Sequence, residues 1–385
     1  MIYLFNSAYR ALYTRNVLNT LFIPKGGTNE YRYRVRGQTT HIAADSYGDF
    51  INAASGDSVV ITFIDRFGHN GYVYHPLRLG RLVRCREQQD RLFFRVSLEE
   101  FVYPRDIGSF NQVLTRSLGQ MGLPCLTGND PRNADDGYYA INAGSLFTAV
   151  NDFHWGEDAW QNAVEQLRRT QAFSETSPPT VVGEEQDATP MEFLFVRCDI
   201  CDQSTKKQQV ASKLRKDLAV FDLLRGARYE FLMSYRYPAQ LTNTSYTATV
   251  EAKFGENLRA LGSTTFNIDS YSNSVPLPFA TKRHLEDNED GVSFEFTSNR
   301  STFRLIGPDA RLLFRFGESK LFWSILVFLL LVFTTLSVVI GADLTKISPL
   351  TICNVVKTLW LKALAGFFQA AVLFVLFRLM GKKFL

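Results

Sequence analysis

The stretch Thr244-Ser-Tyr-Thr-Ala-Thr-Val-Glu-Ala-Lys-Phe254 sets the fold expected for its region. Apolar side chains recur at every second position from Tyr246 to Phe254, which is the period of a strand with one buried face. Similar short runs lie on both sides, at 229–237, 264–268, 292–297, 302–306 and 310–316. Several short strands at this spacing predict a β-sandwich or a small barrel.

Residues 191–320 are therefore expected to form a β-rich second domain, which opens with a strand at 191–198. One segment departs from the strand pattern. Val210, Leu214, Leu218 and Phe221 recur at helical spacing, and Gly226 follows them. This spacing predicts an amphipathic helix that ends at the glycine.

Residues 174–190 are rich in Pro, Ser and Glu and show little periodicity, so they are expected to be an inter-domain linker. The preceding residues, 1–173, are expected to form a mixed β/α domain. The predicted strands are 31–36, 58–64, 71–75, 79–86 and 91–97, and the predicted helices are 107–121 and 144–173. The soluble region as a whole is thus expected to be α+β and rich in strands.

The C-terminal 65 residues have a different composition, with only seven charged side chains. Residues 321–342 contain no charge, and fifteen of these 22 residues are Leu, Ile, Val or Phe. A helix of about 20 such residues spans the hydrocarbon core of a bilayer. Residues 321–342 and 359–380 are therefore predicted to form a two-helix transmembrane hairpin.

The basic residues flanking these spans predict the orientation of the hairpin. Arg311, Arg315, Lys320, Arg378, Lys382 and Lys383 lie on the side of the soluble region, against three lysines in or next to the connecting loop. This bias predicts that both termini are cytoplasmic, with the protein in the cell (inner or plasma) membrane and the lipid bilayer as a partner. Five scattered cysteines and the absence of a basic segment at the start agree with a reducing compartment.

Small residues within the two spans predict close helix packing. The predicted packing residues are Ser337 and Gly341 in the first span and Ala363, Gly366, Gln369 and Ala370 in the second. Small faces let helix backbones approach, and a glutamine amide can form a hydrogen bond across the interface. Packing within one chain and packing between chains are both compatible with this pattern.

The sequence contains few patterns that indicate catalysis or metal binding. Cys198 and Cys201 form a CxxC, but no second ligand pair follows at zinc-site spacing. His69, His75 and His154 are candidates for an unrecognised enzyme site, although turn or surface positions explain them more simply. No nucleotide-binding loop or nucleophile elbow is present. No cofactor, metal or catalytic residue is assigned.

Arginines form the one pattern that suggests ligand binding. Arg32, Arg34 and Arg36 alternate along one predicted strand, and Arg78, Arg84 and Arg86 are placed on one face of another, with Arg91 and Arg95 on the next strand. Guanidinium groups suit phosphates and carboxylates, so one interpretation is that they bind an anionic ligand or an acidic partner. The alternative is a set of solvated faces balanced by acids such as Glu87 and Asp90. Nucleic acid is not favoured, because no soluble segment has a strong basic excess.

These features together favour a membrane-tethered cytoplasmic sensor or adaptor that is not an enzyme. Its β-rich domains would bind a ligand or protein, and its hairpin would oligomerise or perturb the membrane. Membrane effectors of bacterial anti-phage defence systems have a similar general layout, which makes such a role an expectation. The alternatives are a membrane-anchored enzyme with an unrecognised site and a passive structural subunit of a membrane complex.

Overall fold

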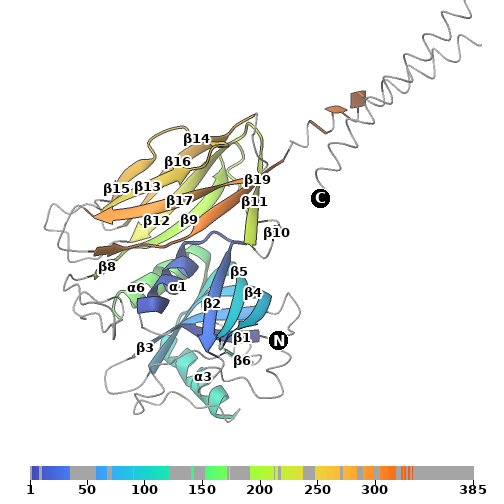
Figure 1. Ribbon diagram of the computed structural model, residues 1–385. Coiled ribbons are helices and arrows are strands. Elements are labelled where there is room, and N and C mark those ends of the chain that lie inside the picture. Colours follow the sequence, from blue (N-terminus) through green and yellow to red (C-terminus); the bar gives the residue numbers. More distant parts are fainter. Residues whose placement is uncertain are drawn as a thin grey trace, which may run out of the picture. The chain divides into compact units, whose positions relative to one another are not determined.

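The computed structural model describes most of the first 317 residues and little of the rest (Figure 1). Residues 1–317 form one compact unit, and residues 318–385 form a second unit. The described residues are 2–7, 11–34, 58–66, 72–89, 91–120, 140–142, 152–170, 173, 191–211, 213–215, 218–236, 248–268, 272–283, 289–298, 304–317, Phe322, Trp323, Ile325, Leu326, Phe328, Leu329 and Val332.

The N-terminal region is built on a seven-stranded sheet with the order β2-β5-β4-β3-β1-β6, and β7 pairs with β5. β1 runs parallel to β3, whereas its other neighbour, β6, is antiparallel. The strands are β1 (Ile2–Ser7), β2 (Thr28–Arg34), β3 (Ser58–Arg66), β4 (Tyr72–Gln88), β5 (Arg91–Pro104), β6 (Ala140–Asn142) and β7 (Phe153–Trp155).

The residues described in this region include three short helices: α1 (Ala11–Phe22), α3 (Ile107–Gln120) and α6 (Gly156–Leu167). α6 buries Ala159, Trp160, Ala163, Val164 and Leu167, which is the apolar stripe expected of a surface helix. The helix predicted at 107–121 agrees with α3. The helix predicted at 144–173 is shorter than expected, because Gly156 has a φ of +59 that separates β7 from α6.

The region after residue 190 forms two sheets that face each other (Figure 1). A six-stranded sheet has the order β10-β11-β19-β17-β13-β15, a four-stranded sheet has the order β14-β16-β12-β9, and β8 pairs with β18. We call this pair of sheets the sandwich. Its strands are β8 (Met191–Phe193), β9 (Phe195–Asp202), β10 (Lys213–Arg215), β11 (Leu218–Leu224), β12 (Arg228–Arg236), β13 (Ala248–Phe254), β14 (Leu258–Ala260), β15 (Thr265–Ile268), β16 (Ser272–Thr281), β17 (Glu289–Ser298), β18 (Arg304–Ile306) and β19 (Arg311–Gly317).

Aromatic side chains fill the sandwich core and continue into the N-terminal region. The ring of Phe231 stacks on Phe279 at 4.5 Å and meets Phe294 edge-on at 5.5 Å. Phe22, the last residue of α1, packs edge-on against the other side of the same core, 5.4 Å from Phe294. Buried residues of both regions thus belong to a shared cluster, and a second cluster around Trp160 also contains Phe193 and Phe195 of the later region. The predicted linker, 174–190, lies outside the described residues.

The helix predicted between Val210 and Phe221 is wrong. The segment forms β10 and β11, and β11 pairs in parallel with β19. The helical spacing is misleading because Val210 and Leu218 are exposed, whereas Val220 and Phe221 are adjacent and both buried. Adjacent buried residues are typical of a strand covered on both faces.

The predicted transmembrane hairpin is contradicted. Among the residues described, no helix is long and apolar enough to cross a membrane. A span needs about 20 continuous apolar helical residues, whereas α3, the longest helix in the described part of the chain, has 14 residues. Within the predicted first span the structure describes only seven residues. The membrane location, the bilayer partner and the orientation depend on the same two spans.

The second predicted span, 359–380, lies outside the described residues. So do the six predicted packing residues, Ser337, Gly341, Ala363, Gly366, Gln369 and Ala370.

Candidate anion-binding face

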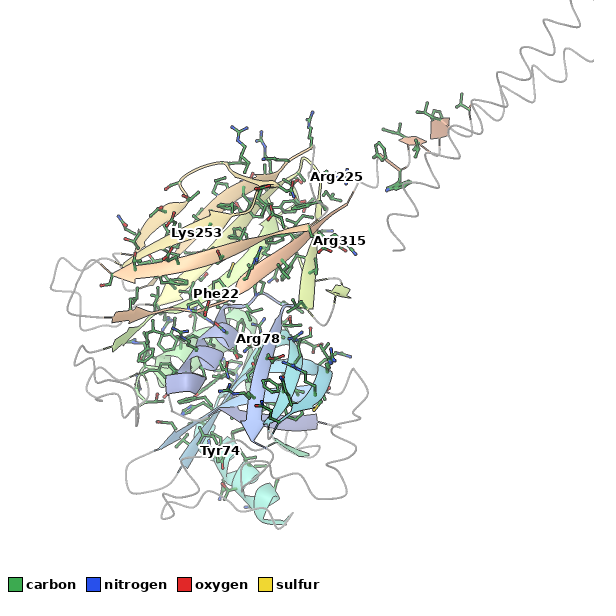
Figure 2. All side chains as sticks on the ribbon, in the orientation of Figure 1. Phe22, Tyr74, Arg78, Arg225, Lys253 and Arg315 are labelled. Atoms are coloured by element: carbon green, nitrogen blue, oxygen red, sulfur yellow. The ribbon has the colours of Figure 1, made fainter. Side chains whose placement is uncertain are left out.

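The predicted ligand-binding arginines do not all reach the surface. Arg78, on β4, is buried with 1% of its surface exposed. Its guanidinium donates hydrogen bonds to the backbone oxygens of Glu99 (2.7 Å), Thr20 (2.9 Å) and Ile23 (2.6 Å), and it lies 4.2 Å from the Phe101 ring centroid. Burial lowers the pKa of Arg78 to about 9. Arg78 therefore fastens the end of α1 to β4 and β5 (Figure 2).

A β-bulge explains why Arg78 and Arg84 differ. The register between β4 and β5 shifts between Arg78 and Gly80, and again between Leu82 and Arg84. At the first shift the additional residue lies on β5, whereas at the second it lies on β4, where it reverses the face on which the side chains after Leu82 lie. Leu82 is buried in the core, whereas Arg84, two positions later, is exposed. Counting every second residue from Arg78 therefore wrongly places Arg78 on the same face as Arg84 and Arg86.

Three more of the predicted arginines, Arg32, Arg84 and Arg86, lie on the outer face of β2, β5 and β4. Arg32 on β2 is the register partner of Phe93 on β5, which is in turn the partner of Arg86 on β4. In the next row, Glu30 is the partner of Arg95, which is the partner of Arg84. We call this surface the arginine face and define it by Arg32, Arg84, Arg86 and Arg95 together with Glu30 and Phe93.

Contacts within the arginine face hold two of the guanidinium groups in place. One oxygen of Glu30 lies 2.7 Å from Nη2 of Arg95, and the other lies 3.5 Å from Nη2 of Arg86. Arg86 also covers the Phe93 ring at 4.5 Å and donates to Oε1 of Gln88 at 3.0 Å. A stacked and hydrogen-bonded guanidinium loses less freedom when it binds a ligand.

The arginine face is cationic and accessible. It contains four arginines and one acid, Glu30, whose carboxylate contacts Arg86 and Arg95. The Arg86 side chain is 41% exposed and the Glu30 side chain is 32% exposed. Arg32 forms no ion pair with any other described residue. β2 is also at one end of the strand order among the described strands, next to β5 only.

The side chains of two predicted arginines, Arg34 and Arg36, are not among those that the structure describes. The backbone of Arg34 pairs with Arg91, which would continue the rows of the arginine face, but neither side chain is described. Arg36 lies outside the described residues. Glu30 and Phe93 are members that the sequence reasoning missed. Alternation along 91–97, which places Phe93 and Arg95 on one side of their strand, is the signal that indicates them.

The cysteine and histidine candidates do not assemble into a site in the described part of the chain. Cys198 is buried, and this burial raises the pKa of its thiol well above its usual value. Cys201 is three residues later on β9, so it lies on the opposite side of the strand. No group of three potential metal ligands occurs among the described residues. His69 lies outside them.

His75 is buried, and its Nδ1 lies 3.0 Å from the hydroxyl of Tyr103. Burial lowers the pKa of His75 to about 4, so the ring is neutral at pH 7. His154, on β7, is the register partner of Tyr103. The packing explains His75 as a core residue of this sheet.

Comparison with known proteins gives little guidance. No protein-family model and no curated protein matches the sequence. A crystal structure of a FixG-related protein from Vibrio parahaemolyticus matches 24% of this chain and 81% of that chain, with 10% identity and a TM-score of 0.18. A likeness at this level supports no conclusion about fold or function.

Proposed function

We propose that this chain is a binding module, a sensor or adaptor, whose arginine face binds an acidic segment of a protein partner. One observation carries the proposal: the carboxylate of Glu30 contacts both Arg86 and Arg95. The chain's own carboxylate thus shows the geometry in which this surface accepts one. Charge-assisted contacts of this kind are about twice as strong as neutral hydrogen bonds.

The arrangement of the face favours an extended acidic segment over a single small anion. Its guanidinium groups lie in two rows across three strands, so they can meet several carboxylates in turn. β2 is at the end of the sheet order among the described strands, where an added strand can pair with its backbone. The proposal therefore combines backbone pairing at β2 with side-chain contacts on the arginine face.

The expectation of a hairpin that oligomerises or perturbs a membrane has no place in the proposal, because the structure contradicts the hairpin. The likeness to anti-phage membrane effectors rests on the same spans and is left aside with them. What the proposal retains is the sensor or adaptor role.

The test is a titration of the full chain into a fluorescently labelled polyglutamate peptide, followed by anisotropy. Arg32→Gln combined with Arg84→Gln should weaken binding by about tenfold or more, because two charged contacts are lost. Lys253→Gln is a matched control that removes an exposed cation from the sandwich. The proposal fails if the native chain does not bind the peptide, or if the control weakens binding as much as the double variant.

A further inference from the structure

The sandwich carries a second cationic surface, at the end where Figure 2 labels Arg225. Arg228 on β12 is the register partner of Ala280 on β16, which is the partner of Arg259 on β14. The chain neighbours of these residues, such as Tyr229 and Phe279, are buried in the core. Arg228 and Arg259 therefore lie on the outer face of the four-stranded sheet, where both are exposed.

The residue between the two arginines has a short side chain. Neighbouring strands are about 4.8 Å apart, so the backbones of Arg228 and Arg259 are separated by about 9.6 Å. Between them Ala280 contributes only a methyl group. Lys282 directly follows the end of β16 and is exposed. We call this surface the alanine slot and define it by Arg228, Arg259, Ala280, Lys282 and Arg283.

Arg283 borders the slot because of a glycine turn. Gly226 has a φ of +68, and a Cβ placed there would lie 3.0 Å from Cγ of Arg283. The Arg283 side chain therefore lies against the turn between β11 and β12. Its guanidinium is brought to the same end of the sandwich as Arg228.

Backbone hydrogen bonds hold the slot in place. The hydroxyl of Thr281 donates to the backbone oxygen of Leu224 at 2.6 Å. The backbone nitrogen of Lys282 donates to the backbone oxygen of Asn257 at 2.9 Å. The backbone that carries Lys282 and Arg283 is thus held to β11 and to the turn before β14 before any ligand arrives.

Two acids of the neighbouring strands, Asp290 and Glu230, are engaged elsewhere. Asp290 accepts hydrogen bonds from the backbone nitrogens of Asn257 and Gly291, and Glu230 pairs with Lys206 at 3.1 Å. None of the four cations of the slot forms an ion pair with another residue in the part of the chain that the structure describes. The slot therefore differs from the arginine face, which already contains a carboxylate.

We propose that the alanine slot binds adjacent phosphate groups of a polyphosphate-type ligand. A phosphate group offers more acceptor oxygens and more charge than a carboxylate, so it can engage both arginines across the slot at once. Lys282 and Arg283 then meet the next phosphate along. This site is separate from the arginine face and does not depend on the function proposed for it.

The test uses the full chain and inorganic tripolyphosphate, with binding followed by calorimetry. Arg228→Gln combined with Arg259→Gln should weaken binding by about tenfold or more. Ala280→Phe keeps every charge but fills the slot with a ring, and it should weaken binding to a similar extent. Ser274→Phe is the matched control, since it places the same ring on the outer face of the same strand about 20 Å away.

The outcomes separate the two sites. Retained tripolyphosphate binding in Ser274→Phe and its loss in Ala280→Phe would support the slot, as would unchanged polyglutamate binding by the Arg228→Gln/Arg259→Gln variant. No binding of tripolyphosphate by the native chain would overturn the proposal. Equal binding by Ala280→Phe and the native chain would also overturn it, because only diffuse charge attraction would then remain.

Discussion

At the scale of single residues, burial decides which of the charged side chains are available to a ligand. Arg78 and Arg84 look alike in the sequence, yet one is enclosed by backbone oxygens and the other is exposed. The difference arises from a bulge, and no local residue preference marks its position. The types of residue in the arginine face could therefore be predicted, but membership in it could not.

Arg78→Lys should destabilise the chain. A lysine ammonium cannot donate to three separated backbone oxygens and stack on Phe101, so buried carbonyls of Thr20 or Ile23 would lose a partner. The expected loss is about 3 kcal/mol in the free energy of unfolding, measured by urea denaturation. Arg84→Lys, at the exposed position, should change it by no more than about 0.5 kcal/mol. Equal stability of the two variants would show that the buried contacts contribute little.

His75 should make stability depend on pH. Its pKa is lowered to about 4 in the folded chain from 6.5 in the unfolded chain. Between these values the unfolded state binds the additional proton, so the free energy of unfolding falls as pH drops from 6.5 toward 4, by up to about 3 kcal/mol. His75→Gln should remove this component of the slope.

The comparison of the two chains by urea denaturation across this pH range isolates the histidine. Acids with lowered pKa values, such as Glu165 and Asp202, remain in both and cancel in the difference. Parallel stability curves for the two chains would mean that His75 titrates normally.

At the scale of elements, the strands with regular alternation of apolar and polar residues could be predicted from the sequence. A strand interrupted by prolines could not. β16 is absent from the expected strands because Pro276 and Pro278 interrupt it. The backbone nitrogen of Leu261 donates to the oxygen of Pro278 at 2.9 Å, so the proline nitrogen also faces the β14 side. The prolines therefore remove no hydrogen bond to β12, which is how a strand can contain them.

The turn between α1 and β2 should tolerate no side chain at its first glycine. Gly26 has a φ of +82, and a Cβ there would lie 2.8 Å from the backbone nitrogen of Ala211. Gly26→Ala should therefore cost about 1–3 kcal/mol in the free energy of unfolding, from backbone strain together with the close contact.

Gly317→Ala is the control for this change, because its Cβ would meet nothing within 4 Å. Urea denaturation of both variants checks the prediction. A neutral effect at Gly26 would mean that the turn relaxes without cost.

At the scale of the whole molecule, the compact unit 1–317 shares one aromatic core. Phe22, the last residue of α1, is fully buried against Phe294 of β17. The sequence pattern shows where strands occur, but it carries no sign of this packing, because long-range contacts between segments about 270 residues apart leave no local period.

Phe22→Ala should lower the stability of both regions together. Loss of the ring leaves a cavity in the shared core, at a cost of about 3–5 kcal/mol. Hydrogen exchange measured by mass spectrometry should show peptides from β5 and from β12 losing protection in parallel. Leu261→Ala, at an exposed position, should leave both unchanged. Loss of protection in only one region would show that the two regions unfold independently.

The account rests on the arginine face accepting carboxylates in the place that Glu30 occupies. The most direct measurement is polyglutamate binding by Glu30→Gln, compared with Glu295→Gln, which removes the same charge from the ion pair with Lys253 on the sandwich. If Glu30 competes with the ligand for Arg86 and Arg95, Glu30→Gln should bind about tenfold more tightly than the native chain, while Glu295→Gln should bind as the native chain does. Equal binding by the two variants would contradict the account.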